Sequence, residues 1–183
     1  MKYLKIPKER VGVLIGHNGE TKKMIERISK TTLEIDSAEG EVTIDEHETS
    51  DPVLGVIVEN VVRAIGRGFS PEHAMHLFKD DMDFFIFNLH DYVGKKDSHT
   101  KRIKSRIIGT DGKTKRAIEN LTGAILSIYG HTVALIADFE SMDVAKKAID
   151  MILSGSKHAS VYRYVEREMR KIRLGKKPIL NDY

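Results

Sequence analysis

The sequence predicts an α+β fold made of two copies of one unit followed by a basic C-terminal helix, and three observations lead to this prediction. The chain has 183 residues, which is long for one small domain and suits two compact ones. Sliding the sequence against itself by 93 residues aligns residues 15–22 with residues 108–115. Downstream of this segment, each half shows one helical pattern, two alternating patterns typical of strands, and a closing helix.

The aligned segment contains the pattern Gly-x-x-Gly in both halves, at residues 16–19 and 109–112. The match continues beyond the glycines, because Ile25 and Leu33 align with Ile118 and Leu126 at the same offset. This agreement at one offset indicates an internal repeat.

The remaining elements follow in the same order in each copy. Strands are expected at residues 3–6 and 84–89 ahead of the glycines, with a helix between each strand and its glycine loop. Downstream strands are expected at 32–35 and 42–44 in the first copy, and at 125–128 and 133–136 in the second. The closing helices are predicted at about 52–65 and about 142–153, the second with Ser141 as its N-cap.

The first closing helix and the segment after it suggest how the domains are joined. Segment 53–65 is apolar nearly all round, so we expect it to be buried between two domains that pack together as a rigid pair. Ser70 and Pro71 predict the start of a linker helix that runs through Phe78. The predicted organisation is therefore a first domain at 1–68, a linker helix at 69–83, and a second domain at 84–183 that includes a C-terminal helical extension.

Composition excludes several classes of protein. The chain has no cysteine, which excludes disulfides, thiolate zinc sites, iron–sulfur clusters and cysteine nucleophiles. No segment approaches the roughly 20 apolar residues that a membrane helix requires, and no apolar signal core follows Met1–Lys5. We therefore expect a cytoplasmic protein without membrane contact and without a cofactor.

Charge is distributed unevenly along the chain. Residues 1–90 carry 11 Lys and Arg against 16 Asp and Glu, whereas residues 91–183 carry 19 against 11. The two halves thus have net charges of −5 and +8. The second half is the predicted polyanion-binding part of the molecule.

The order strand, helix, Gly-x-x-Gly, helix, strand, strand, helix resembles the KH domain of type I topology. The alternative type II topology places a helix and two strands ahead of the glycine loop, and only 15 residues precede Gly16. The resemblance implies two KH domains, each a three-stranded sheet with three helices. It also implies a non-enzymatic protein whose loop clamps about four nucleotides of single-stranded RNA.

The candidate RNA-binding residues follow from this resemblance and from the surrounding charge. Backbone N–H groups at a helix N-terminus favour a phosphate, and glycines let the chain approach it closely. In the second copy the candidates are Gly109, Thr110, Asp111, Gly112, Lys113, Lys115, Arg116, Arg102, Lys104 and Arg106, with an apolar groove of Ile107, Ile108, Ile118 and Ile128. In the first copy they are Gly16, His17, Asn18, Gly19 and Lys22.

The last helix is expected to extend the basic surface of the second domain. Its apolar stripe, formed by Val161, Val165, Met169 and Ile172, is predicted to pack on that domain. Arg163, Arg167 and Arg170 would then lie on the exposed side and contact RNA. An ordinary solvated face is the alternative for these arginines.

Acidic residues predict a weaker role for the first loop. The strands of the first copy and their connections carry Glu34, Asp36, Glu39, Glu41, Asp45, Glu46 and Glu48. Carboxylates beside a phosphate-binding groove repel the ligand. We expect the first copy to bind RNA weakly or to serve chiefly as an interaction surface.

Two segments resemble a particular family. Residues 106–119 and the segment 152–162, which leads into the final helix, are similar to the partner-of-Nob-one or Dim-two ribosome-assembly proteins, particularly the archaeal members. This resemblance implies binding near the 3′ end of small-subunit ribosomal RNA during its maturation. The implied partners are a processing endonuclease and other assembly or translation factors. The usual KH pattern has an apolar residue three positions after the second glycine, whereas this chain has Lys22 and Lys115.

Other functions remain open at this point. A KH-fold scaffold for protein interactions and a general RNA-binding regulator are the alternatives from the binding classes. An RNA-processing enzyme would use Asp80, Asp81 and Asp83, although a solvated loop explains these three residues more simply. His73 and His76 lack a third metal ligand at a characteristic spacing, and Ile107 stands where a nucleotide-binding P-loop requires glycine.

Overall fold

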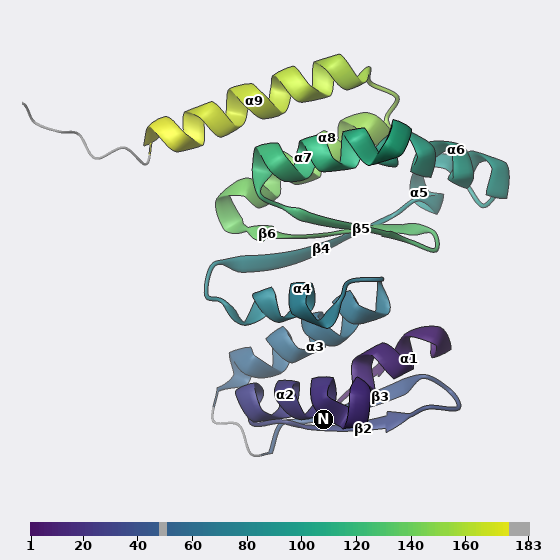
Figure 1. Cartoon of the computed structure of the whole chain (residues 1–183), viewed down its shortest axis with the longest axis vertical. Helices are drawn as coiled ribbons and strands as arrows, with labels where there is room; N and C mark the ends of the chain where they lie inside the picture. The colour runs from purple at the N-terminus through teal and green to yellow at the C-terminus, as the bar shows by residue number, and fades with distance from the viewer. Residues whose placement is uncertain (48–50, 176–183) are drawn as a thin grey trace, which may run out of the picture. The chain divides into compact units, whose positions relative to one another are not determined.

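The computed structural model describes residues 1–47 and 51–175 (Figure 1). Contacts within the chain divide it into two compact units: Met1–Phe84 together with Ser127–Gly130, and Phe85–Leu126 together with the chain from His131 onward. The expected linker segment at 69–83 is therefore grouped with the first unit. Within the described ranges, no helix is long and apolar enough to cross a membrane.

The first unit contains a three-stranded antiparallel sheet. The strands β1 (Lys2–Lys5), β2 (Thr32–Asp36) and β3 (Glu41–Asp45) lie in the order β1-β3-β2. The register pairs Leu4 with Val42 and Leu33 with Ile44. Because side chains alternate between the faces of a strand, this register puts the apolar residues on one face, where Leu33, Val42 and Ile44 are fully buried.

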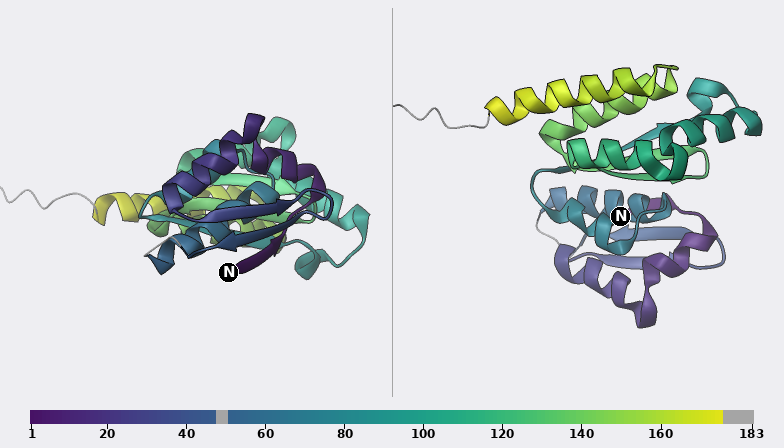
Figure 2. Two further views of the ribbon diagram at one scale, coloured as in Figure 1. Left: turned by 90° about the horizontal axis from the view of Figure 1, so that it is seen from below. Right: turned by 45° about the horizontal axis from the view of Figure 1, so that its top comes forward.

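Three helices cover the apolar face of this sheet (Figures 1 and 2). They are α1 (Lys8–Ile15), α2 (Glu20–Ser29) and α3 (Pro52–Gly66), and the short turn η1 (His17–Gly19) links the first two. Asp51 caps α3 by accepting a hydrogen bond from the Val53 amide at 2.9 Å. The chain continues into α4 (Pro71–Met75), which Ser70 caps as predicted, and the turn η2 (His76–Phe78).

Arg10 joins the first helix of this unit to the end of the third. Its Nε donates to the Ile65 carbonyl at 2.8 Å and its Nη2 to the Phe69 carbonyl at 2.6 Å. The Ile65 carbonyl also accepts a hydrogen bond from the Gly68 amide at 3.1 Å, so the guanidinium adds a second bond at the helix end and pairs the Phe69 carbonyl just beyond it. A cation at this end of α3 also complements the helix dipole.

The second sheet repeats the strand order of the first. The strands β4 (Met82–Asn88), β5 (Ile125–Tyr129) and β6 (Thr132–Asp138) lie in the order β4-β6-β5. The helices are α5 (His90–Val93), α6 (Asp97–Ile108), α7 (Lys113–Thr122) and α8 (Phe139–Leu153), with the turn η3 (Thr110–Gly112) between α6 and α7. The predicted α+β class and the type I order of elements are thus confirmed, while the one-turn helix α5 was not predicted.

The N-terminus of α8 differs from the prediction. The helix begins at Phe139, and its cap is Asp138, whose carboxylate accepts hydrogen bonds from the Ser141 amide and hydroxyl, both at 2.9 Å. Ser141 was predicted as the cap because it precedes the first clear helical period. Asp138 is also the last residue of β6, so β6 leads directly into the helix.

The final helix, α9 (His158–Gly175), packs on α7 and α8 (Figures 1 and 2). Val161 and Val165 have no exposed surface, Met169 is 8% exposed and Ile172 is half-buried, so most of the predicted apolar stripe is buried within the second unit. The described part of this unit is therefore a sheet covered by one layer of helices, with α9 as a further layer over α7 and α8.

Replacing Arg10 tests its role in the first unit. Arg10→Met removes the charged donor from the Ile65 and Phe69 carbonyls, of which Ile65 keeps the Gly68 amide, and should lower the local free energy of unfolding by about 1 to 3 kcal/mol. Hydrogen exchange of the α3 amides measures this loss. The control is Arg27→Met on the exposed side of α2, which should cost about 0.5 kcal/mol or less. If Arg10→Met and Arg27→Met lower the free energy of unfolding by the same small amount, Arg10 does not stabilise the end of α3.

Candidate nucleic-acid interface

The second glycine loop has a backbone that depends on its first glycine. Gly109 has φ +73° and ψ 171°, and Gly112 has φ +74°. A Cβ atom on Gly109 would lie 2.3 Å from the Thr114 hydroxyl oxygen and 2.7 Å from the Thr114 amide nitrogen. Both the positive φ and this close approach exclude a side chain at Gly109. Thr114 itself is buried, with 4% of its surface exposed.

The first glycine loop has the same conformation. Gly16 has φ +76° and ψ 175°, and a Cβ atom there would lie 2.4 Å from the Thr21 hydroxyl oxygen. The glycine–threonine packing is thus common to the two loops. Sequence reasoning did not assign a role to Thr21 or Thr114, although their alignment in the repeat was the signal that pointed to one.

A basic side chain braces each loop from the following helix. Arg116 donates from Nη2 to the Asp111 carbonyl at 2.6 Å, and Lys23 donates from Nζ to the Asn18 carbonyl at 3.3 Å. Asp111 and Asn18 both have φ +50°, a left-handed conformation that Asp and Asn tolerate better than most residues. Arg116, a predicted RNA-binding residue, therefore supports the shape of the loop.

The lysines that depart from the usual KH pattern form ion pairs in each copy. Lys115 Nζ lies 2.9 Å from Glu119 Oε1, and the same oxygen accepts a hydrogen bond from the Leu126 amide at 2.9 Å. In the first copy Lys22 lies 3.8 Å from Glu26, which accepts from the Leu33 amide at 2.8 Å. Each lysine thus stabilises a carboxylate that ties the second helix of the unit to its next strand.

The two loops differ in the residue that begins the following helix. Lys113 is the exposed first residue of α7, whose first turn contains no acidic side chain, whereas Glu20 is the first residue of α2. A carboxylate at a helix N-terminus occupies the position that favours an anion, and a lysine leaves it available. The two helices therefore differ in charge at the end next to the loop, although the backbones match.

The other basic candidates of the second copy have different surroundings. Arg102 is exposed and Lys104 is half-buried. Arg106 donates to the Ile152 carbonyl at 2.9 Å and the Ser156 carbonyl at 2.6 Å, so it holds the end of α8. These two carbonyls hold the Arg106 guanidinium in place. Its positive charge at the surface therefore has a fixed position.

The predicted apolar groove is largely core. Ile107 and Ile118 have no exposed surface, because they pack beneath the loop where α6 meets α7. Ile108 is 37% exposed next to Gly109, and Ile128 is half-buried in β5. Ile108 is thus the isoleucine of this set with the most surface for a base.

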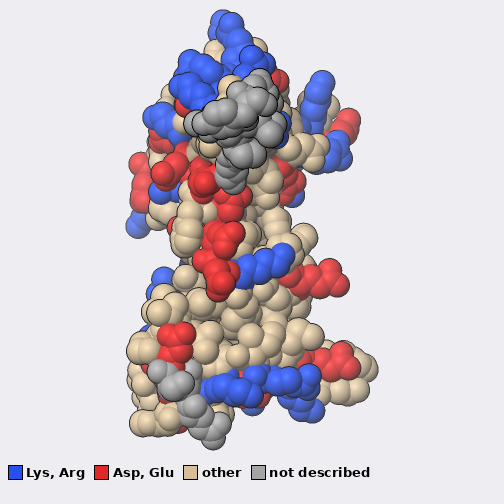
Figure 3. Space-filling view, turned by 90° about the vertical axis from the view of Figure 1, so that its left-hand side faces the viewer, with Lys and Arg blue, Asp and Glu red and all other residues tan. Residues whose placement is uncertain are grey.

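The arginines of α9 lie on its exposed side. Arg163, Arg167 and Arg170 are exposed. Figure 3 shows Lys and Arg side chains gathered at the top of the view, in the second unit. Arg167 pairs with Glu168 at 2.7 Å, and Lys171 pairs with the same carboxylate. Hydrogen bonds from Arg167 and Lys171 hold the pKa of Glu168 below its usual range.

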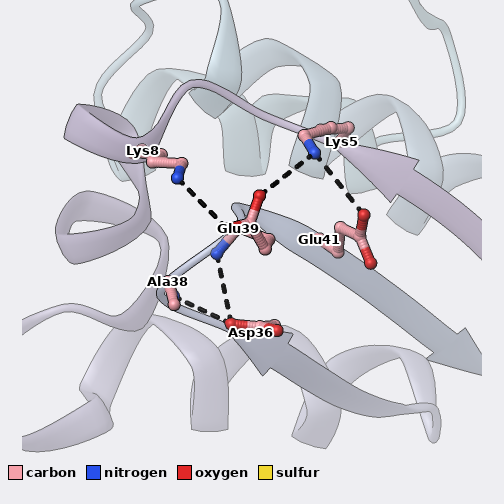
Figure 4. Close-up of polar contacts among 6 residues, drawn as sticks. All are labelled: Lys5, Lys8, Asp36, Ala38, Glu39 and Glu41. Carbon is pink, nitrogen blue, oxygen red and sulfur yellow. Dashed lines mark hydrogen bonds and ion pairs between the residues drawn. The ribbon is translucent and has the colours of Figure 1, made fainter.

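Several carboxylates of the first unit are paired with lysines (Figure 4). Lys5 lies 3.5 Å from Glu41 and 3.7 Å from Glu39, and Lys8 lies 3.4 Å from Glu39. Asp36 accepts from the amides of Ala38 and Glu39 and so shapes the turn between β2 and β3. These contacts reduce the repulsion expected from the acidic residues of this unit. Glu48 lies outside the described residues.

The alternative metal sites gain no support from the geometry. The rings of His73 and His76 lie edge to face with centroids 6.4 Å apart. In the described ranges, no group of three or more His, Asp or Glu side chains is placed to hold a metal ion. Asp80 and Asp81 precede β4 as the loop interpretation expects, whereas Asp83 is the second residue of the strand, where it accepts a hydrogen bond from the Phe84 amide at 2.7 Å.

Comparison with known proteins places the chain among KH proteins. A model of the eukaryotic-type KH domain (KH domain type I) matches residues 83–170, and a general KH-domain model matches residues 1–52. A KH domain-containing protein of Methanocaldococcus jannaschii is 45% identical over 174 residues, which cover 94% of this chain and 76% of that protein.

Solved structures extend this similarity to nearly the whole chain. Dim2p from Pyrococcus horikoshii matches with a TM-score of 0.84 and 46% identity over 91% of this chain and 98% of its own. A chain of the a/eIF2alpha–aDim2p–rRNA complex from the same organism has a TM-score of 0.85 and 45% identity, covering 93% and 94%. A protein of unknown function from Aeropyrum pernix has a TM-score of 0.91 and 38% identity, covering 96% and 93%.

The repeated fold and its two glycine loops define a tandem type I KH protein, the class that holds single-stranded nucleic acid at a Gly-x-x-Gly loop. Within this class, the chain belongs to the archaeal partner-of-Nob-one or Dim2 family. The family resemblance expected from residues 106–119 and 152–162 is thereby confirmed.

The packing of Gly109 against Thr114 predicts an unusually large effect of one methyl group. Gly109→Ala should lower the Tm by several degrees more than Gly123→Ala, because the added carbon meets Thr114 at 2.3 Å. Gly123 is the matched control, since its φ is also strongly positive at +77° but its Cβ would have no neighbour within 4 Å. Thermal denaturation followed by circular dichroism measures the difference. Similar shifts would show that the contact with Thr114 has no energetic importance.

Proposed function

We propose that this chain binds single-stranded ribosomal RNA of the small subunit during its maturation, near the 3′ end, with the second glycine loop as the principal clamp. The observation that carries the proposal is the bare backbone at Gly109–Gly112 leading into a helix that begins with Lys113. The Pyrococcus relative whose structure is a complex with rRNA supports the choice of RNA.

The clamp works through the backbone. The first N–H groups of α7 lack intrahelical partners and carry the positive end of the helix dipole, so they favour an RNA phosphate. Lys113 and Arg102 neutralise part of its charge, and Ile108 offers an apolar surface to a base beside the loop. Arg163, Arg167 and Arg170 extend the attraction along α9 through longer-range electrostatics.

In this proposal the first copy has a secondary role. Its loop keeps the conformation that a phosphate requires, but Glu20 stands at the N-terminus of the helix that would receive it. Gly16, His17, Asn18 and Gly19 therefore contact RNA weakly, and Lys22 is engaged with Glu26. The first unit then serves chiefly as an interaction surface.

Partners complete the proposal. The chain acts as a binding protein, and cleavage of the rRNA is the task of a partner endonuclease rather than of Asp80, Asp81 and Asp83. The Pyrococcus relative assembled with a/eIF2alpha supports contact with translation or assembly factors.

A carboxylate placed in the second loop should weaken RNA binding. Thr110 is exposed beside Asp111, so Thr110→Asp adds a second negative charge to the clamp without touching the core. We expect the Kd for single-stranded RNA to rise by at least about tenfold, measured by fluorescence anisotropy. The matched control, His17→Asp in the first loop, should change the Kd about twofold or less. An unchanged Kd for Thr110→Asp would contradict the proposed clamp.

Exchanging the residues that begin α2 and α7 tests why the copies differ. Lys113→Glu should raise the Kd by about five- to twentyfold, because it reverses the charge at the helix end that holds the phosphate. Glu20→Lys should lower the Kd of the first unit, detected as new RNA-induced shifts of the residue 17–20 amides in NMR spectra. If Glu20→Lys has no effect at the first loop, the helix-terminal charge does not explain the difference.

A further inference from the structure

A groove on one side of the second loop has no assigned ligand. It has a volume of about 500 Å³ and lies between α6, the loop and the first turns of α9. We call it the α9 groove, lined by Arg102, Ser105, Arg106, Lys113, His158 and Tyr162 with the loop residues Gly109, Thr110 and Thr114. A groove of this volume is large enough for a nucleotide-sized ligand.

Hydrogen bonds fix the two aromatic residues of the groove against the helices on either side of the loop, α6 and α7. The Tyr162 hydroxyl lies 3.2 Å from the Thr114 hydroxyl, so it reaches the residue that packs on Gly109. His158 Nε2 lies 2.9 Å from the Arg106 carbonyl, and Arg106 in turn holds the chain between α8 and α9. The rings of His158 and Tyr162 lie nearly parallel, with centroids 6.3 Å apart.

The chemistry of the lining favours a nucleic acid. Arg102, Arg106 and Lys113 bring positive charge, and the described residues that line the groove include no Asp or Glu. Aromatic rings offer stacking surfaces to any base, whatever its identity. Lysine is depleted at protein–protein interfaces, so Lys113 in the lining suits a phosphate better than a protein partner.

We propose that the α9 groove binds one further nucleotide of the strand held by the glycine loop, with its phosphate near Arg102 and Lys113 and its base against Tyr162 and His158. This inference rests on the proposed function, because the groove shares Gly109, Thr110 and Lys113 with the clamp. It extends the RNA-binding site beyond about four nucleotides and assigns the beginning of α9 to RNA recognition.

The first copy has no such groove residues. The closing helices α3 (Pro52–Gly66) and α8 (Phe139–Leu153) are 87 residues apart, and the element that follows α3 is the five-residue helix α4 (Pro71–Met75) in place of α9. At this offset His158 and Tyr162 correspond to Pro71 and Met75, so the first copy has no aromatic side chain at either position. The two aromatic rings of the groove are therefore a feature of the second copy.

The experiment compares two lengths of RNA on the full chain. End-labelled, randomised pools of four and seven nucleotides are titrated by fluorescence anisotropy with the wild type, Tyr162→Ala and Tyr162→Phe. The control is Tyr164→Ala, which removes a half-buried tyrosine of the same helix from outside the groove. For Tyr162→Ala we expect a rise of about tenfold in the Kd of the seven-nucleotide pool and little change for the four-nucleotide pool. Tyr162→Phe keeps the ring and should stay within about threefold of the wild type for both lengths.

Two other outcomes would overturn the proposed nucleotide site in the α9 groove. A seven-nucleotide Kd that Tyr162→Ala leaves unchanged, or raises no more than Tyr164→Ala does, would overturn the groove. Equal losses for the two lengths, shared by Tyr162→Phe, would also overturn it, because Tyr162 would then act by holding Thr114. Failure of the proposed function is distinguishable, since Thr110→Asp would then leave the binding of the four-nucleotide pool unchanged.

Discussion

The packing of Gly109 against Thr114 is the contact on which the rest of the second unit's surface depends. It brings the loop backbone against the start of α7, at a distance that no residue with a Cβ atom could reach. Because Gly109 has no side chain, a ligand can approach the loop backbone directly. The N-terminus of α7 lies next to this backbone. Gly16 and Thr21 repeat this contact, so the repeat preserved the backbone of the clamp.

The two copies differ in the charge at the start of the helix after the glycine loop and in the elements that follow the KH fold. Glu20 and Lys113 occupy equivalent positions and have opposite effects on an approaching phosphate. The second copy also continues into α9, from which Tyr162 reaches Thr114 at the start of α7. In the proposed function, one repeated geometry thus provides a principal RNA-binding loop and a surface with a secondary role.

The fold was predictable because the repeat, the strand alternation and the glycines agree over two independent copies. The side-chain roles were harder to predict, since Arg106 looks like one more cation in a basic run but holds the end of α8. Likewise, Ile107 and Ile118 have the apolar character of a groove but lie in the core. The approach of Tyr162 to the loop joins residues 48 positions apart, a tertiary contact that no local pattern contains.

If the backbone at residues 109–113 holds the RNA, the amides of these residues change their environment on binding, and NMR chemical shifts measure that change. Titrating the ¹⁵N-labelled full chain with single-stranded RNA reports on every loop N–H group without any mutation. We expect the largest shifts at Gly109–Lys113, followed by the α9 groove, with smaller shifts at Gly16–Gly19. Shifts confined to another surface, with the amides of residues 109–113 unmoved, would show that this backbone does not hold the RNA.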